Sequence, residues 1–262
     1  MNSLKMMWGG LRYEFLMQIR RPALWLTFLG FAFLVGRSIL SELDDPRFLA
    51  MHASTLQLAA TVALLTNWLA PLGVGIFLAD RLPRDRRTRV EELLNTLPGT
   101  LKLRLLSKYL GATLATLLPA LLLYMLVLVL CVWRTGNLLL FPLGLLCYAV
   151  VVLPGMFFVA SFSVACPVVI WTPLYQFLFF GYWFWGNLFS PHSGLPTLNG
   201  TILTPIGSVI DASFFGAPAF GGVGPGPTPV LAGIASLATL LGLAVLVMIA
   251  LYRFMRWEQA RQ

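Results

Sequence analysis

Residues 80–108 read DRLPRDRRTRVEELLNTLPGTLKLRLLSK, a charged stretch that separates two long apolar runs. The stretch holds eight of the chain's 18 Lys and Arg residues and four of its 10 Asp and Glu residues. Charged side chains at this density are costly inside a bilayer. We therefore expect an aqueous segment at a membrane surface, flanked on both sides by membrane-spanning helices.

The composition of the whole chain supports this expectation. The 262 residues are 58% hydrophobic and 11% charged, whereas soluble globular proteins carry roughly 25% charged residues. Apolar runs near or above the roughly 20 residues needed to cross a bilayer recur along the sequence. The sequence therefore predicts an all-α polytopic membrane protein, in which residues 1–262 form a single transmembrane domain.

Six apolar runs are long enough to be predicted as transmembrane helices. Each is bounded by charged residues, by Pro and Gly, or by a short polar connection. The predicted spans are Ala23–Leu40, Thr55–Ala79, Tyr109–Trp133, Leu138–Ala165, Val168–Gly186 and Val230–Leu251.

Two further segments are predicted to lie at the membrane surfaces. Residues 1–22 mix apolar and basic side chains, which favours an amino-terminal interfacial helix with a possible break at Gly9 and Gly10; a frayed tail is the alternative. Residues 187–229 contain no Lys or Arg and many Gly and Pro. This composition favours short helices in an outer re-entrant region between spans five and six.

The distribution of basic residues predicts the orientation. Four Lys and Arg precede the first span, eight lie in residues 80–108 and three lie in the tail, which leaves Arg37, Arg47 and Arg134 for the other side. Cytoplasmic loops are enriched in basic residues. We therefore expect a multi-pass protein of the inner (plasma) membrane with both termini cytoplasmic, and we attribute the net charge of +8 to contact with acidic membrane lipids and not with nucleic acid.

Residues typical of catalysis and metal binding are sparse. The chain has two histidines, His52 and His192, and three cysteines without paired spacing, so we expect no catalytic residue, no bound cofactor and no metal site. Gly99 is followed by TLK without the second glycine of a phosphate-binding loop. We therefore expect the chain not to be an enzyme, and any ATP to be bound by another protein.

The middle of the charged stretch has a helical pattern. Val90, Leu93, Leu94 and Leu97 recur at i, i+3, i+4 and i+7, and Pro98 with Gly99 follows. The pattern predicts a short amphipathic helix. It could contact a cytosolic protein, or it could lie on lipid as a basic amphipathic loop.

The order of these features resembles the permease subunit of type-2 ABC transporters over essentially the full chain. An amphipathic helix ending in QIRRP precedes two spans, the pattern D-R-x-x-x-x-R-R-T-x-V-x-E-L-L-x-x-x-P begins at Asp80, and SKYL opens the third span. The resemblance implies a dimer with a second permease copy or a related permease. It also implies a cytosolic ABC ATPase subunit that carries the ATP and Mg²⁺.

The resemblance further implies that residues 80–108 are a cytosolic coupling segment whose coupling helix docks into the ATPase subunit. Arg89 departs from the pattern, because many relatives carry Gly there. The contact residues implied for this chain are Arg87, Thr88, Val90, Glu91, Glu92, Leu93 and Leu94.

We expect the substrate pathway to involve polar and aromatic side chains of the second and fifth spans. Gln57, Thr61, Leu64 and Trp68 share one helix face, which fits either a pathway or helix-to-helix hydrogen bonding. The candidates are Thr61, Asn67, Trp68, Tyr175, Phe179 and Tyr182.

This lining favours export of an apolar or amphipathic substrate, such as a lipid, a peptide or a drug-like molecule, by alternating access. The alternative function is a non-transport membrane assembly or immunity factor that uses the same loop to recruit a cytosolic partner.

Overall fold

The computed structural model describes residues 3–45, 54–88, 100–189, 194, 196–216 and 228–261. Within these ranges all regular structure is helical, which confirms the predicted all-α class. The predicted amphipathic helix at residues 90–97 and both histidines lie outside the described residues.

In the described part of the chain, five helical segments are long and apolar enough to cross a membrane, as expected for a multi-pass membrane protein. They are α2 (Pro22–Leu43), α4 (Thr55–Ala79) with its extension α5 (Arg81–Arg87), α7 (Leu101–Thr135), the segment Leu140–Val168, and α12 (Val230–Gln259). The predicted fifth span corresponds to α10 (Thr172–Leu188), whose 17 residues make it shorter than these five.

Local sequence signals explain several helix ends. The Ser54 hydroxyl accepts a hydrogen bond from the Gln57 backbone N–H at 3.1 Å, and the Gln57 side chain accepts one from the Ser54 N–H, which caps α4. Pro22 occupies the first turn of α2, where no N–H is needed. Gly136 ends α7 at φ +69°, a left-handed conformation that glycine adopts without steric cost.

The predicted fourth span changes its helical geometry in the middle. α8 (Leu140–Cys147) continues into five π-helical residues, η1 (Tyr148–Val152), then into α9 (Leu153–Ala165) and the short 3₁₀ turn η2 (Cys166–Val168). Pro154 lacks an N–H, and a proline ring clashes with the carbonyl four residues earlier, here Val150. The π turn η1 includes Val150, so the regular α-helical geometry is interrupted at this position.

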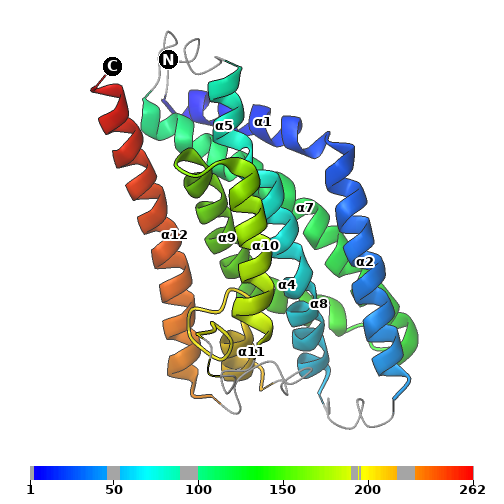
Figure 1. Ribbon diagram of the computed structural model, residues 1–262. Helices are drawn as coiled ribbons and strands as arrows, with labels where there is room; N and C mark the ends of the chain where they lie inside the picture. Colours follow the sequence, from blue (N-terminus) through cyan, green and yellow to red (C-terminus); the bar gives the residue numbers. More distant parts are fainter. Residues whose placement is uncertain are drawn as a thin grey trace.

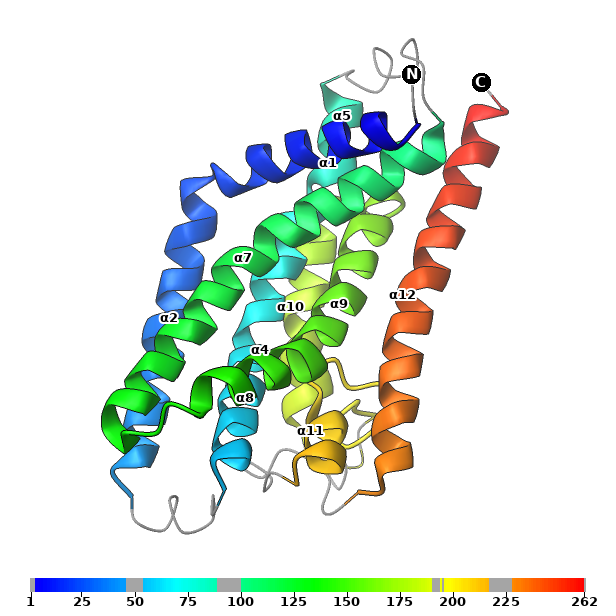
Figure 2. The ribbon, with the colours of Figure 1, turned by 180° about the vertical axis from the view of Figure 1, so that it is seen from behind.

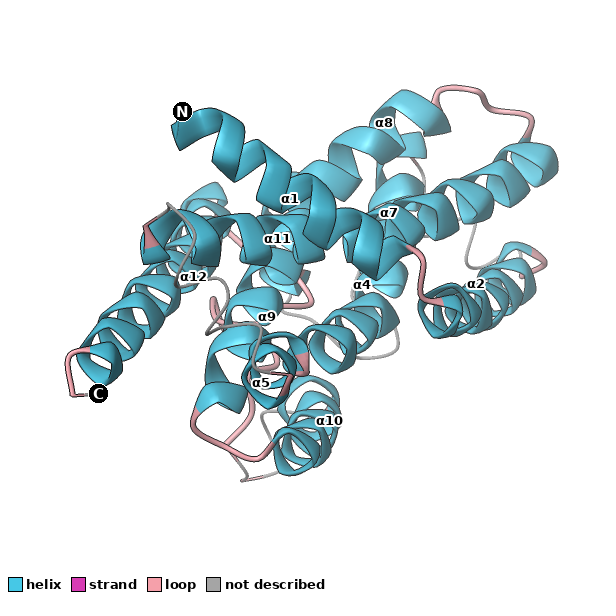
Figure 3. Cartoon of the chain, turned by 90° about the horizontal axis from the view of Figure 1, so that it is seen from above, coloured by secondary structure: helices cyan, strands magenta, loops and turns pink. Residues whose placement is uncertain are grey.

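The long helices run side by side, and α1 (Ser3–Ile19) lies across one end of the bundle (Figures 1 and 2). Both termini lie at this end, which we call the terminal end. α1 packs on the first half of α7 and runs unbroken through Gly9 and Gly10, where the sequence allows a break. Seen from above, α12 stands at the edge of the bundle (Figure 3).

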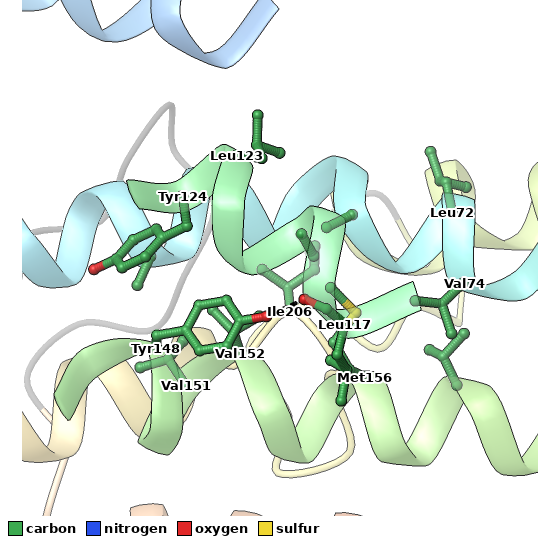
Figure 4. Close-up of a cluster of buried hydrophobic side chains, with 14 of the residues drawn as sticks. Leu72, Val74, Leu117, Leu123, Tyr124, Tyr148, Val151, Val152, Met156 and Ile206 are labelled. Carbon is green, nitrogen blue, oxygen red and sulfur yellow. Dashed lines mark hydrogen bonds between the residues drawn. The ribbon is translucent and has the colours of Figure 1, made fainter. Parts of the chain in front are cut away.

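The buried core lies between α4, α7 and the fourth helical segment (Figure 4). The Tyr124 hydroxyl donates to the Gly144 carbonyl at 2.9 Å, and the Tyr148 hydroxyl donates to the Leu117 carbonyl at 3.2 Å. These bonds join neighbouring helices where water is excluded. The described part of the predicted re-entrant region holds one short helix, α11 (Ser208–Phe214), packed against α12.

Candidate functional site

Four charged side chains, three of them buried and Asp85 partly buried, meet at the terminal end, and we call them the charge cluster: Glu14 of α1, Arg81 and Asp85 of α5, and Lys108 of α7. The Lys108 Nζ lies 2.5 Å from Glu14 Oε1 and 2.7 Å from Asp85 Oδ2. The Arg81 Nη1 lies 3.6 Å from Glu14 Oε2, and Arg81 is only 1% exposed. The cluster therefore joins three helices by buried ion pairs.

Small residues allow α1 and α7 to approach closely enough for these contacts. A Cβ on Gly111 would lie 2.6 Å from the Leu11 carbonyl oxygen and 2.9 Å from Glu14 Cβ. A Cβ on Gly10 would lie 2.9 Å from Ser107 Oγ. Glycine at these positions brings the Glu14 carboxylate next to the first turns of α7, where it reaches Lys108.

The two carboxylates and two cations of the cluster balance formally. Taking such groups out of water costs free energy, which their mutual attraction repays only when the geometry is good. The contacts of Lys108 are short, whereas the guanidinium of Arg81 makes no hydrogen bond to another described residue. Glu14 therefore holds Arg81 mainly by Coulombic attraction and Lys108 by a hydrogen-bonded ion pair.

Further cations lie beside the cluster. Burial lowers the pKa of Arg21, which lies between α1 and α2, and the like charge of Arg84 lowers it further. The negative charges of Asp80 and Glu14 raise the pKa of Arg21 and so partly offset this lowering. At the terminal end, Glu14 therefore interacts with three cations, Arg21, Arg81 and Lys108.

A second ion pair extends the connection to the last helix. The Arg86 Nη2 lies 2.5 Å from Glu258 Oε2 near the end of α12, and both side chains are about one-third exposed, at 31% and 36%. α5 is therefore linked by ion pairs to α1, α7 and α12. A displacement of α5 must move these helices or break the ion pairs.

Only the first part of the predicted coupling segment is described. Arg87 and Thr88 are exposed at the end of α5, and the Thr88 hydroxyl donates to the Arg84 carbonyl at 2.9 Å. The other five expected contact residues, Val90, Glu91, Glu92, Leu93 and Leu94, lie outside the described residues.

The sequence predicts the segment but not the contacts of the charge cluster. It places Arg81 and Lys108 among the basic residues of residues 80–108, and Glu14 within the predicted interfacial helix. One signal was available, because Glu14 is the single acidic residue before the first span. An isolated carboxylate in a basic amphipathic helix suggests a specific cationic partner.

The structure places the α4 pathway candidates largely in the protein interior. Thr61 and Asn67 are buried and Trp68 is partly buried. The Asn67 Nδ2 donates to the backbone carbonyls of Pro205 at 3.0 Å, Ile206 at 2.8 Å and Val151 at 3.4 Å. For Asn67 the contacts favour hydrogen bonding between elements, and its role in a pathway stays a prediction.

The α10 candidates divide between two faces. Tyr175 is buried, with its hydroxyl 2.8 Å from Ser163 Oγ, and its ring stacks on Phe179 at 5.8 Å between centroids. Phe179 covers Gly75 of α4, where a Cβ would lie 2.1 Å from the ring. Tyr182 is 53% exposed. The structure thus brings Tyr175 and Phe179 against the bundle and leaves Tyr182 on the outer face.

The α4 and α10 candidates are connected through Trp183. Its Nε1 donates to the Trp68 carbonyl at 2.9 Å, and its ring lies 5.8 Å from that of Phe179. These contacts hold α10 against α4. Their part in substrate movement stays a prediction.

Comparison with protein-family models found no match, and a search of curated protein sequences also found none. Among the described residues, no group of three His, Cys, Asp or Glu side chains could hold a metal ion.

Proposed function

We propose that this chain is the permease subunit of an ATP-driven ABC exporter in the inner membrane. It would work as a dimer with a second copy or a related permease, with six spans and cytoplasmic termini. A cytosolic ATPase subunit would bind ATP and Mg²⁺ and dock on residues 80–108. The observation that carries the proposal is that α5, the start of this segment, is tied by ion pairs to α1, α7 and α12.

This arrangement suits the transmission of movement. ATPase closure would displace the docked segment, and the buried ion pairs would resist separation of α5 from its neighbours, because an unpaired buried charge is costly. The displacement would therefore pass to the bundle as a rigid-body movement. The permease itself would need no catalytic residue, and its apolar interior suits an apolar or amphipathic substrate.

The test is ATP hydrolysis by the complex that copurifies with the tagged chain from its native membrane. We expect Mg²⁺-dependent hydrolysis with the wild type and at least about a tenfold loss with Glu92→Arg, a change equivalent to roughly 1.4 kcal/mol of docking free energy. Glu42→Arg is the matched control. It makes the same substitution in the last turn of α2, away from the terminal end of the bundle, and should keep the activity.

Unchanged hydrolysis with Glu92→Arg would contradict docking through this segment, and no hydrolysis in the wild-type complex would contradict the proposal as a whole. Reconstitution in vesicles then separates the two candidate functions. Substrate movement that requires ATP supports the exporter. A stable cytosolic partner without substrate movement supports the assembly or immunity factor.

A further inference from the structure

A groove of about 760 Å³ lies between α7, α9 and α12, near the terminal end. α12 stands at the edge of the bundle and packs mainly on α9 and α11, and the start of α7 approaches its last turns (Figure 2). The groove fills the space between these helices. Its lining includes Lys102, Leu106, Tyr109, Val245, Ile249 and Arg253.

The groove opens on the outer surface of the bundle. Leu106, Val245 and Ile249 line it and are 37%, 59% and 49% exposed. Tyr109 also lines it and is buried, and its hydroxyl donates to the Phe157 carbonyl at 2.9 Å. The wall offers mainly apolar contact to an occupant that enters from the side.

The length of the groove is close to the thickness of the hydrocarbon layer of one leaflet. Its α12 wall runs from Leu241 to Arg253, which corresponds to about 18 Å at 1.5 Å per helical residue. Half of a hydrocarbon core is about 15 Å thick. An acyl chain of the leaflet at the terminal end would therefore extend along most of this wall.

The charged residues described in the groove lining are both basic. Among the described residues that line it, Lys102 and Arg253 are the only charged ones, and both are exposed. They lie in the first turn of α7 and near the end of α12, where lipid headgroups would meet the terminal end. Among the described residues, no carboxylate forms an ion pair with either cation.

We propose that this groove binds an anionic phospholipid of the surrounding bilayer. The phosphate would lie between Lys102 and Arg253, and an acyl chain would lie against Leu106, Val245 and Ile249. The charge complementarity favours an anionic over a zwitterionic lipid, and the lateral opening favours a lipid over a water-soluble ligand. The site requires α7 and α12 to lie in a membrane, and it does not depend on the proposed exporter function.

The test is native mass spectrometry of the detergent-solubilised full chain titrated with phosphatidylglycerol or phosphatidylcholine. We expect the wild type to bind phosphatidylglycerol more tightly. The double variant Lys102→Gln/Arg253→Gln should lose about thirtyfold in affinity for it, the effect of two basic residues at an anionic lipid surface. Lys5→Gln/Arg12→Gln removes the same charge from exposed positions on α1 and should leave the affinity unchanged.

A second variant tests the apolar wall. Val245→Trp narrows the groove from its exposed side and keeps both cations, so it should weaken phosphatidylglycerol binding while the protein keeps its wild-type unfolding temperature. Equal affinity for the two lipids, equal losses in the two double variants, or a copurifying protein in place of lipid would each overturn the proposal.

Discussion

Asn67 is a fully buried amide in α4 that holds an irregular segment of backbone in place. Its Nδ2 lies within hydrogen-bonding distance of three carbonyls that come from η1 and from residues 205–206. Gly155 allows this approach, because a Cβ there would lie 2.0 Å from the Pro205 carbonyl oxygen. One amide therefore supplies the donor that carbonyls outside regular helix need where water is excluded.

Substitution Asn67→Leu should destabilise the protein by about 1–3 kcal/mol, because it leaves buried carbonyls without a donor. Thr66→Val is the matched control. The Thr66 hydroxyl donates only to the Val62 carbonyl of its own helix, so its loss should cost less. Thermal unfolding in detergent measures both, and equal shifts in the two variants would contradict this role of Asn67.

The buried carboxyl group of Asp211 should make the stability of the protein depend on pH. Asp211 is buried in α11, outside the five long apolar segments, and burial raises its pKa from 3.8 to about 7. The folded state therefore holds the proton more tightly than the unfolded state between these values. The free energy of unfolding should fall as the pH rises from about 4 to about 7, and stay low above that range.

The unfolding temperature of the wild type should therefore decrease between pH 5 and pH 8. Asp211→Asn cannot ionise, so it should remove this part of the slope and be more stable than the wild type at pH 8. Parallel profiles for the two proteins would show that Asp211 is not the titrating group.

At the scale of the elements, most helices could be predicted because their signals are local. The predicted second span coincides with α4, since the Ser54 and Gln57 cap and the charged residues after Ala79 mark both ends. The first turns of α7 and the last turns of α12 lie outside the predicted spans, because amphipathic residues continue each helix beyond its apolar run. The sequence does not predict the π turn at residues 148–152, although two prolines, Pro142 and Pro154, lie in this span.

The charge cluster could not be predicted, because it depends on where α1 lies. A pattern in α1 defines its apolar and polar sides but not the helix on which it rests. Glu14 and Lys108 meet only because glycines bring α1 and α7 together. The same reasoning applies to Asn67, whose carbonyl partners lie in segments far along the chain.

Breaking the cluster should separate α1 from the bundle end. Glu14→Gln leaves the buried cations Lys108 and Arg81 without that carboxylate, which should cost about 3–5 kcal/mol. Glu258→Gln is the matched substitution in the more exposed pair with Arg86 and should cost about 0–1 kcal/mol. Thermal unfolding in detergent measures both, and protease cleavage near α1 should increase only for Glu14→Gln. Similar losses in the two variants would contradict a special role of the buried cluster.

At the scale of the whole molecule, the aromatic residues of α10 show which surfaces face outward. Tyr175 and Trp183 are buried against the bundle, whereas Phe177 is 76% exposed and Tyr182 is 53% exposed. Exposed leucines and phenylalanines continue along α2, including Leu29 and Phe33. Such apolar outer faces suit contact with lipid or with another membrane helix.

The positions of the two termini predict how many times the chain crosses the membrane. Both lie at one end of the bundle (Figure 1), so we predict an even number of crossings, with α10 as the sixth span. Basic residues are concentrated at this end, so it should be cytoplasmic. Single cysteines introduced as Lys5→Cys and Arg256→Cys in a Cys166→Ala background should react with a membrane-impermeant maleimide only after the cells are permeabilised.

Ser41→Cys, on an exposed position near the opposite end of α2, should react in intact cells. Cys131 and Cys147 are buried and contribute little background. Labelling of Lys5→Cys and Arg256→Cys on opposite sides would contradict the even number of crossings. Labelling of both in intact cells, with Ser41→Cys protected, would place the charge cluster outside the cell and remove it from reach of any cytosolic ATPase.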